Sequence, residues 1–243
     1  MLAWVVVILF SATALFSLFQ MNRLGLLPSA AAGDGAVFSA YSKPFEPTRL
    51  VIPMTGLFTT PAIQQTFVDD FTLGVQDWSA LQGAISLKDE SMQLLPNWLT
   101  EGGTAVWNLP EALLTPSFIY SADLSTRAKA WQRFGLALNL QPDGSGLLFM
   151  VEPDTGKVAI FQRTGRELTE LSPWQNSPTL LPAPYPNRIE VNCTTQSILL
   201  CINGVQAASI PPPLPCNQGQ LGLFVLTPGS RISADNVSLS TLR

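Results

Sequence analysis

The chain has 243 residues, of which 47% are hydrophobic and only 12% charged, and it carries a formal net charge of −4 without a single histidine. The absence of histidine excludes Ser-His-Asp and Cys-His nucleophiles, histidine general bases and histidine metal ligands. The sequence has no cluster of Lys and Arg to neutralise phosphates, so we expect no nucleic-acid partner. The length fits one large β-sandwich or two small domains, and the sparse charge suits a protein that lies against a membrane or other subunits.

The first element is an uncharged apolar segment from Leu2 to Phe19. As a helix it would be about 27 Å long, just enough to cross the hydrocarbon core of a bilayer. Nothing basic precedes it, and the small residues Ala30–Ala32 lie farther beyond its end than the cleavage site of a secretory signal normally does. A retained transmembrane helix over residues 1–22 is therefore favoured, with a cleaved signal as the alternative.

The charges after this segment leave its orientation open. Arg23, Lys43 and Arg49 follow the apolar run, and the positive-inside rule would place them in the cytoplasm. They are few and widely spaced, however, and a long following domain can be exported regardless of them.

Residues 23–63 form a segment without a clean helix or strand period. Its prolines and glycines recur at intervals that prevent a long helix or a central strand. We expect an extended linker that lies against its own domain or a partner, because a solvated tether would not carry its large apolar side chains: Phe38, Tyr41, Phe45, Leu50, Val51, Ile52 and Phe58.

Residues 64–243 consist of short β-rich runs broken by turn residues, without a convincing helical period. Many short strands without intervening helices predict an all-β antiparallel sandwich or barrel rather than a parallel α/β sheet. The expected strands are TFVDDF, AISL, SMQLL, TAVWNL, SFIYSADL, RFGLALNL, GLLFMVE, KVAIFQR, RELTEL, NRIEVNC, SILLCI, VQAASI, GQLGLFVL and ISADNVSLS.

One hairpin can be placed in register from the sequence. Asn203-Gly204 is a favoured two-residue type I′ turn, because both residues accept a positive φ. This turn, with another at residues 194–197, predicts the pairs Ile202–Val205, Leu200–Ala207, Val191–Leu200 and Ile189–Ile202.

The three cysteines, Cys193, Cys201 and Cys216, include no C-x-x-C pair, so a zinc site has no support. Their odd number argues against a dense disulfide framework. Strand neighbours alternate between faces, which puts Cys201 on the opposite face from Cys193 and disfavours a disulfide between these two.

Four segments follow one another in a recognisable order. The segment DDFTLGVQDWSALQGAISLKDESMQLLP has an Asp-Phe strand, a Trp and a strand pair around a Gly; RFGLALNLQPDGSGLLFMVEPDTGKVAIFQR reads as central hairpins; NRIEVNCTTQSILLCINGVQA ends in an INGV-type hairpin; and GQLGLFVLTPGSRISADNVSLS supplies closing strands. In this order they resemble the concanavalin A-like lectin/glucanase superfamily, which includes laminin-G-like modules, over about Phe67 to Leu242.

The resemblance implies two curved antiparallel sheets in a jelly-roll sandwich over residues 64–243. It also favours a single-pass membrane protein with this domain on the extracytoplasmic side, periplasmic or luminal. A fold shared so widely does not fix function.

Hydrolases of this fold resemble one another in a Glu-x-Asp-x-x-Glu strand, whose carboxylates share one face. The sequence has only Glu152-Pro153-Asp154, without the last Glu and with a strand-breaking proline, so we expect a turn there. Asp154-Thr155-Gly156 resembles an aspartic protease triplet, but that site needs two such loops. We therefore predict no enzyme and no cofactor.

No metal is expected either. Four aspartates could offer oxygens to calcium, but no loop brings them together at the spacing of a ligand set: Asp69, Asp70, Asp143 and Asp235.

Aromatic residues are the remaining candidates, because sugar-binding sites stack pyranose rings on Trp or Tyr beside polar groups. Trp131 and Arg133 lie at an expected strand start, Trp174 lies in an expected loop over residues 172–176, and Tyr185 lies between two prolines. These four are the candidate ligand-binding residues. The alternative for each Trp is a place in the core, which we expect for Trp78 and Trp107.

The sequence thus predicts a membrane-anchored, extracytoplasmic and non-catalytic module, held in the membrane by residues 2–19, that recognises a glycan or a protein partner. A structural accessory subunit of a larger membrane complex, of the respiratory or photosynthetic type, is the second hypothesis, since the apolar linker and low charge suit a packed position. A glycoside hydrolase is the third, and the missing carboxylates and histidines count against it.

Overall fold

The computed structural model describes residues 63–96, 102–110, 113–127, 132–228 and 230–242. The expected transmembrane helix over residues 1–22, almost all of the expected linker, and Trp131 lie outside these ranges. Within the described ranges, no helix has the length and apolar character needed to cross a membrane.

The described chain is all-β. Its strands are β1 (Ile63–Asp69), β2 (Trp78–Gln82), β3 (Ala84–Lys88), β4 (Ser91–Leu95), β5 (Gly103–Trp107), β6 (Phe118–Thr126), β7 (Phe134–Leu140), β8 (Gly146–Glu152), β9 (Lys157–Thr164), β10 (Glu167–Asn176), β11 (Asn187–Cys193), β12 (Ile198–Ile202), β13 (Val205–Ile210), β14 (Gln220–Val225) and β15 (Ile232–Leu242).

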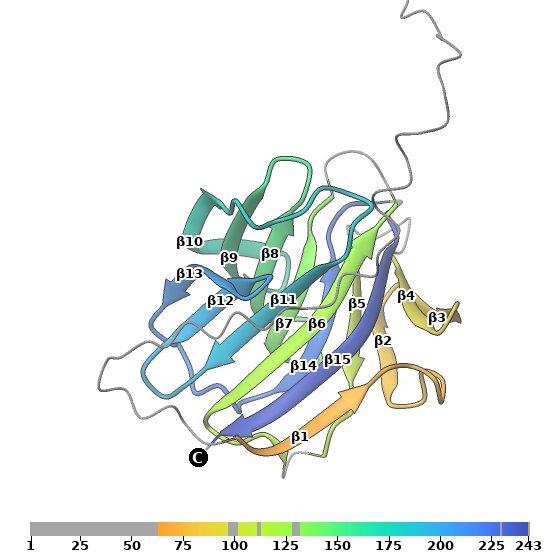
Figure 1. Ribbon diagram of the computed structural model, residues 1–243. Coiled ribbons are helices and arrows are strands. Elements are labelled where there is room, and N and C mark those ends of the chain that lie inside the picture. Colours follow the sequence, from red (N-terminus) through yellow and green to blue (C-terminus); the bar gives the residue numbers. More distant parts are fainter. Residues whose placement is uncertain (1–62, 97–101, 111–112, 128–131, 229, 243) are drawn as a thin grey trace, which may run out of the picture. The chain divides into compact units, whose positions relative to one another are not determined.

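These strands form two antiparallel sheets that stack face to face (Figure 1). The eight-stranded sheet has the order β13-β12-β11-β6-β15-β4-β3, with β1 also paired to β15. The seven-stranded sheet has the order β10-β9-β8-β7-β14-β5-β2. The arrangement confirms the predicted antiparallel sandwich.

The expected strands named by sequence left out β2 and ended the run of β10 too early. The resemblance did place a strand pair around the Gly that follows Trp78, and β2 lies directly before this Gly. Trp78 was correctly assigned to the core. The loop expected over residues 172–176 is wrong, because β10 continues to Asn176 and therefore contains Trp174. Pro173 is tolerated there because β10 is an edge strand and its register against β9 shifts on either side of Ser172.

The predicted hairpin is confirmed except at one pair. Asn203 and Gly204 have φ angles of 51° and 81°, as the two-residue turn requires. Leu200 pairs with Ala208 and not with Ala207, because a register shift follows Leu200. The other predicted pairs are present: Ile202–Val205, Val191–Leu200 and Ile189–Ile202.

The main core lies between the sheets and is built from alternate residues of each strand. Trp78 and Trp107 are both buried there, as predicted, and their rings stack with centroids 5.5 Å apart. Trp107 also contacts Tyr120, whose hydroxyl donates a hydrogen bond of 3.1 Å to the carbonyl of Gly222. This aromatic chain extends from the edge strand β2 into the core and joins the two sheets.

The seven-stranded sheet is apolar on its other face as well. A second cluster of buried side chains comes from positions that alternate with the core positions of the same strands, and it includes Leu148, Met150 and Phe224. Phe161 and Trp174 are half-buried against it. This explains why β7, β8 and β14 read as continuous apolar runs rather than as alternating patterns.

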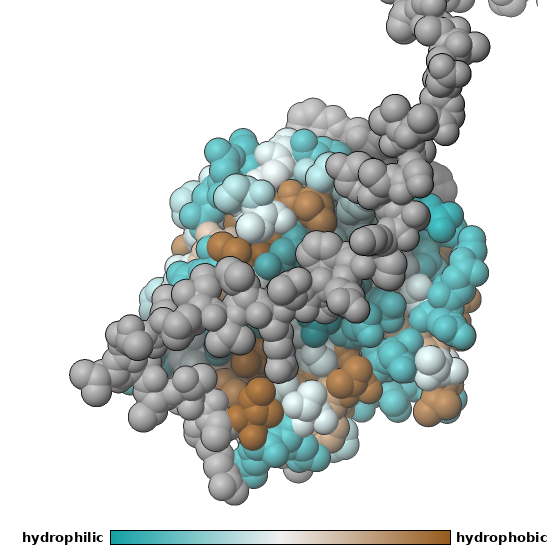
Figure 2. All heavy atoms as spheres, in the orientation of Figure 1, coloured by the Kyte–Doolittle hydropathy of each residue, from teal (hydrophilic) through white to brown (hydrophobic). Residues whose placement is uncertain are grey.

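The outer face of the eight-stranded sheet is polar by contrast. The Arg188 guanidinium donates hydrogen bonds to Ser121 Oγ at 2.7 Å, to Ser238 Oγ at 2.9 Å and to the carbonyl oxygen of Asn236 at 2.6 Å. It thereby links β6, β11 and β15 beside an irregularity in β15. On the side of the molecule drawn in Figure 2, hydrophilic residues cover much of the described surface, with hydrophobic ones scattered between them.

Candidate functional site

Two of the four candidate residues, Arg133 and Trp174, meet at one end of the seven-stranded sheet. The Arg133 Cζ atom lies 5.2 Å from the centroid of the Trp174 ring, a cation–π contact. Arg133 Nε donates a hydrogen bond of 2.7 Å to Glu152 Oε2. Phe161 supports the Trp174 ring from the sheet, with centroids 5.9 Å apart and planes tilted by 57°. The arrangement is an aromatic ring held in place by an ion pair and a second ring.

Strand order explains why these residues meet. Arg133 precedes the first residue of β7, Glu152 ends β8, and Trp174 lies near the end of β10. The strand neighbours of Arg133 and Glu152, Phe134 and Val151, lie in the core, so these two side chains point to the outer face. Trp174 packs against the apolar cluster on that same face. The neighbours are paired across the sheet in the order Phe134–Val151, Val151–Val158 and Val158–Gln175.

The ion pair joins an exposed cation to a buried anion. The side chain of Arg133 is 46% exposed, whereas that of Glu152 is only 6% exposed. Glu152 Oε1 also accepts a hydrogen bond of 3.0 Å from the Thr155 hydroxyl. Both carboxylate oxygens are therefore occupied, which makes Glu152 an anchor for Arg133 and leaves it poorly placed for general acid or base chemistry.

The backbone of Arg133 is fixed as well. Its N–H donates to Thr227 Oγ1 at 3.0 Å, and its carbonyl accepts from the Leu226 N–H at 2.8 Å. Within the described residues, the terminal nitrogens of Arg133 donate no hydrogen bond. They are thus available to a ligand beside the Trp174 ring, since the guanidinium itself lies over the ring.

Tyr185 lies apart from this pair. It is 61% exposed, on the loop between β10 and β11, where its backbone N–H bonds to the carbonyl of Pro182. No ring contact or hydrogen bond of the described chain joins Tyr185 to Arg133 or Trp174. The fourth candidate, Trp131, lies outside the described residues.

Sequence reasoning missed Glu152 as a member of the site. The turn predicted at residues 152–156 is present, with the Gly156 N–H bonded to the carbonyl of Pro153 at 3.3 Å. The role of the Glu152 carboxylate depends on the register of β7 against β8, which places it beside Arg133. The sequence could have shown this contact. When the runs RFGLALNL and GLLFMVE are paired as a hairpin, the first residue of one, Arg133, lies beside the last residue of the other, Glu152.

Two of the aspartates considered as calcium ligands, Asp70 and Asp143, accept hydrogen bonds from residues of their own turns. The Ser145 backbone N–H and hydroxyl hold the pKa of Asp143 below its usual value, and the Thr72 hydroxyl and backbone N–H do the same for the pKa of Asp70. Across the described ranges, no three His, Cys, Asp or Glu side chains are grouped to hold a metal ion.

No protein family model and no curated protein sequence matches the chain. Solved structures do match it. The carbohydrate-binding module CBM66 from Bacillus subtilis has a TM-score of 0.55 at 13% identity, over 69% of this chain and 97% of that one. A protein of unknown function with a galectin-like fold, also from Bacillus subtilis, has a TM-score of 0.53 at 14% identity, over 76% and 100%.

The exoplasmic/lumenal domain of VIP36, in its Ca²⁺/Man3GlcNAc-bound form, has a TM-score of 0.53 at 11% identity, over 75% of this chain and 91% of that one. Similarity at such low identity establishes the fold alone. The chain therefore has a lectin-like jelly-roll fold, as the resemblance implied.

Proposed function

We propose that this chain is a non-catalytic, extracytoplasmic binding module that recognises a glycan at the surface formed by Trp174 and Arg133. The observation that carries the proposal is the half-buried Trp174 ring, held by Phe161 and Arg133 beside terminal guanidinium nitrogens that no other described residue binds. An aromatic ring offers apolar surface to the carbon face of a pyranose, while the guanidinium offers several donors to its hydroxyls.

The arrangement suits binding because little has to be ordered when a ligand arrives. Glu152 already fixes the Arg133 side chain, and Phe161 supports the Trp174 ring. A preordered ring and donor lower the entropic cost of association. The lectin-like fold of the sandwich agrees with the proposal.

Glycan binding can be tested with the full chain in detergent micelles on an array of oligosaccharides ending in mannose, glucose, galactose or fructose. We expect at least one class to bind, and Trp174→Ala to weaken that binding by about tenfold or more because the stacking surface is removed. Trp174→Phe retains a ring and is expected to lose less affinity. Glycan titrations measured by calorimetry would give the ratios.

Val205→Ala provides the matched control, since Val205 is an exposed apolar residue of the β12–β13 hairpin, which belongs to the other sheet. It should bind like the wild type. Binding to no member of the array, or equal affinity of the wild type and Trp174→Ala, would refute the proposed site.

An oxidising compartment is supported by the bond between Cys193 and Cys216, since disulfides persist mainly in extracytoplasmic proteins. Cys201 is unpaired, and burial and the neighbouring Glu190 raise the pKa of its thiol to about 11. We propose that residues 2–19 tether the chain to the membrane, with the sandwich on the periplasmic or luminal side.

Counting thiols tests this location. When cells are quenched in acid and the denatured chain is alkylated with iodoacetamide, mass spectrometry should find one label per chain. After reduction the same chain should carry three, because it has three cysteines. Three labels without reduction would contradict an oxidising location.

With the folded chain at pH 8, labelling of Cys201 should be slow, because only about one thiol in a thousand is ionised when the pKa is three units above the pH.

A place in a larger membrane complex is the second candidate function. It is favoured by an exposed apolar loop on the described surface, formed by residues 211–215, which no glycan site requires.

A further inference from the structure

The loop between β13 and β14 begins with the sequence Pro-Pro-Pro-Leu-Pro over residues 211–215. Four of its five residues are proline, which fixes φ and removes the backbone N–H. A proline also disfavours the helical conformation of the residue before it. The chain bends at Pro213 and Leu214, both of which are exposed, and the Leu214 side chain is 46% exposed at this bend. The loop is stiff and presents apolar side chains to solvent.

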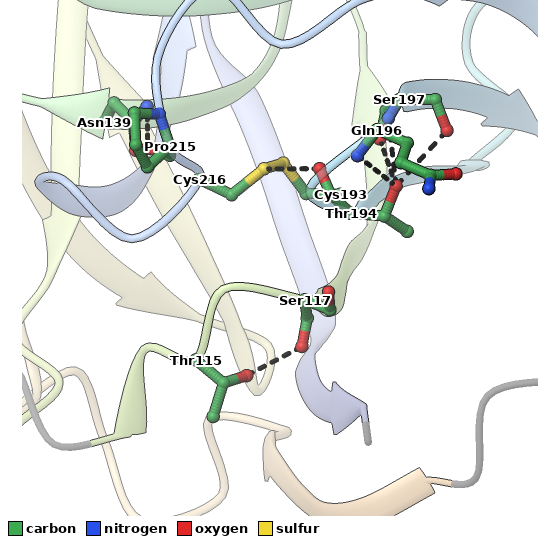
Figure 3. The surroundings of a disulfide bond; sticks show 9 residues. All are labelled: Thr115, Ser117, Asn139, Cys193, Thr194, Gln196, Ser197, Pro215 and Cys216. Carbon is green, nitrogen blue, oxygen red and sulfur yellow. Dashed lines mark hydrogen bonds between the residues drawn. A yellow bond between two sulfur atoms is a disulfide. The ribbon is translucent and has the colours of Figure 1, made fainter.

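The loop is anchored at its C-terminal end. Cys216 is bonded to Cys193 at the end of β11, and Asn139 Nδ2 donates a hydrogen bond of 3.1 Å to the carbonyl of Pro215 (Figure 3). Gln141 Nε2 binds the Gln218 carbonyl at 2.8 Å. The chain then passes so close to the backbone of Asn139 that a Cβ atom at Gly219 would lie 2.6 Å from its carbonyl carbon, so only glycine fits.

The surroundings of the loop are uncharged. A depression of about 250 Å³ lies beside it, lined by Pro116, Thr194 and Thr195 together with loop residues. Residues 191–230 contain no charged side chain at all. Among the described residues that form the loop and line this depression, a partner meets prolines, one leucine and hydroxyl groups, and no charged side chain.

We propose that residues 211–215 form a docking surface for a protein partner, which receives Pro213 and Leu214 in an uncharged pocket lined by aromatic side chains. Proline-rich segments are recognised by aromatic-lined grooves, because the rings pack on the flat pyrrolidines and the stiff chain loses little entropy on binding. The disulfide and the Asn139 contact add to this preordering. The surface lies at the far end of β7 from Arg133, so it is separate from the proposed glycan site.

A lipid bilayer is a poorer match to the same loop. Interfacial anchoring in membranes relies on aromatic side chains and on Lys or Arg facing anionic headgroups. The loop offers a single large apolar side chain, Leu214, and no basic residue. The observations therefore favour a protein.

Photo-crosslinking tests the proposal in the native membrane. The full chain is produced in its host with benzoylphenylalanine in place of Leu214 or, as the matched control, in place of Leu168, which is 44% exposed on the edge strand β10. We expect a protein adduct from position 214 only, with the crosslinked peptide of the partner containing Trp, Tyr or Phe. Adducts with lipid alone, with another copy of this chain alone, equal adducts from both positions, or no adduct at position 214 would overturn the proposal.

The partner identified in this way is then purified and its affinity measured. Leu214→Ser should weaken binding by about tenfold, as expected for a buried anchor residue, whereas Leu168→Ser should leave it unchanged. Raising the salt concentration should change the affinity by no more than about twofold, because no ion pair contributes. A strong salt dependence, or equal affinities of the wild type and Leu214→Ser, would refute docking through this loop. None of these results depends on glycan binding.

Discussion

Replacing Trp78 with alanine is expected to lower the free energy of unfolding by about 3–5 kcal/mol, the usual cost of truncating a large buried aromatic side chain. Trp78 stacks on Trp107 at 5.5 Å and contacts Phe71 at 6.0 Å. Its Nε1 donates a hydrogen bond of 2.8 Å to Asp69 Oδ2, while Asp69 Oδ1 accepts from the Phe71 N–H at 2.9 Å. The variant leaves a cavity beside Trp107. It also removes the indole N–H, one of the two donors named above that bind the Asp69 carboxylate.

Urea unfolding of the full chain in detergent, followed by circular dichroism, measures the loss. Trp78→Phe keeps a ring on Trp107 and should lose less, mainly the hydrogen bond to the Asp69 carboxylate, which is worth about 1.5–3 kcal/mol. Leu73→Ala is the surface control, since Leu73 is 87% exposed and its change should lie within about 0.5 kcal/mol of zero. If Trp78→Ala is no less stable than Leu73→Ala, the proposed packing around Trp78 is wrong.

Removing the disulfide is expected to cost about 3 kcal/mol, because the bond closes a loop in the unfolded chain and lowers its entropy. The two cysteines are 23 residues apart in sequence. The variant Cys193→Ala/Cys216→Ala avoids placing hydroxyl groups at two buried positions. Its unfolding midpoint in urea should fall, while β11 keeps its pairing with β6 and β12, which uses backbone groups only.

Two comparisons separate the effect of the crosslink from other causes. Reduction of the wild type should lower its stability by a similar amount, and reduction of the double variant should change nothing. Cys201→Ala removes the unpaired cysteine and should have a much smaller effect. An unchanged midpoint in the double variant would show that the bond does not stabilise the fold.

The two proposed surfaces use opposite ends of one strand. Arg133 precedes β7, whereas Asn139, which holds the proline loop, lies near its end. A module of this form could bind a glycan at one end and a protein at the other without competition. The Trp174 and Leu214 variants should therefore each affect one interaction and leave the other intact.

Local sequence pattern determined much of the fold. Alternation of apolar and polar residues along β6, β11 and β15 identified these strands, because one face of their sheet packs in the core and the other meets polar surroundings. Asn203-Gly204 placed a hairpin turn correctly, since few residues other than Asn and Gly accept two successive positive φ angles. The sequence also placed Trp78 and Trp107 in the core.

Only the tertiary structure decided which distant residues meet. Arg133 and Glu152 are 19 residues apart, and Cys193 and Cys216 are 23 apart, so no local period relates them. Their contacts depend on which strands are neighbours and on the register between them, where a shift of one residue would turn each side chain to the other face. Trp174 shows the same dependence, because Pro173 reads as a strand breaker until β10 is known to be an edge strand, where a missing N–H costs no hydrogen bond.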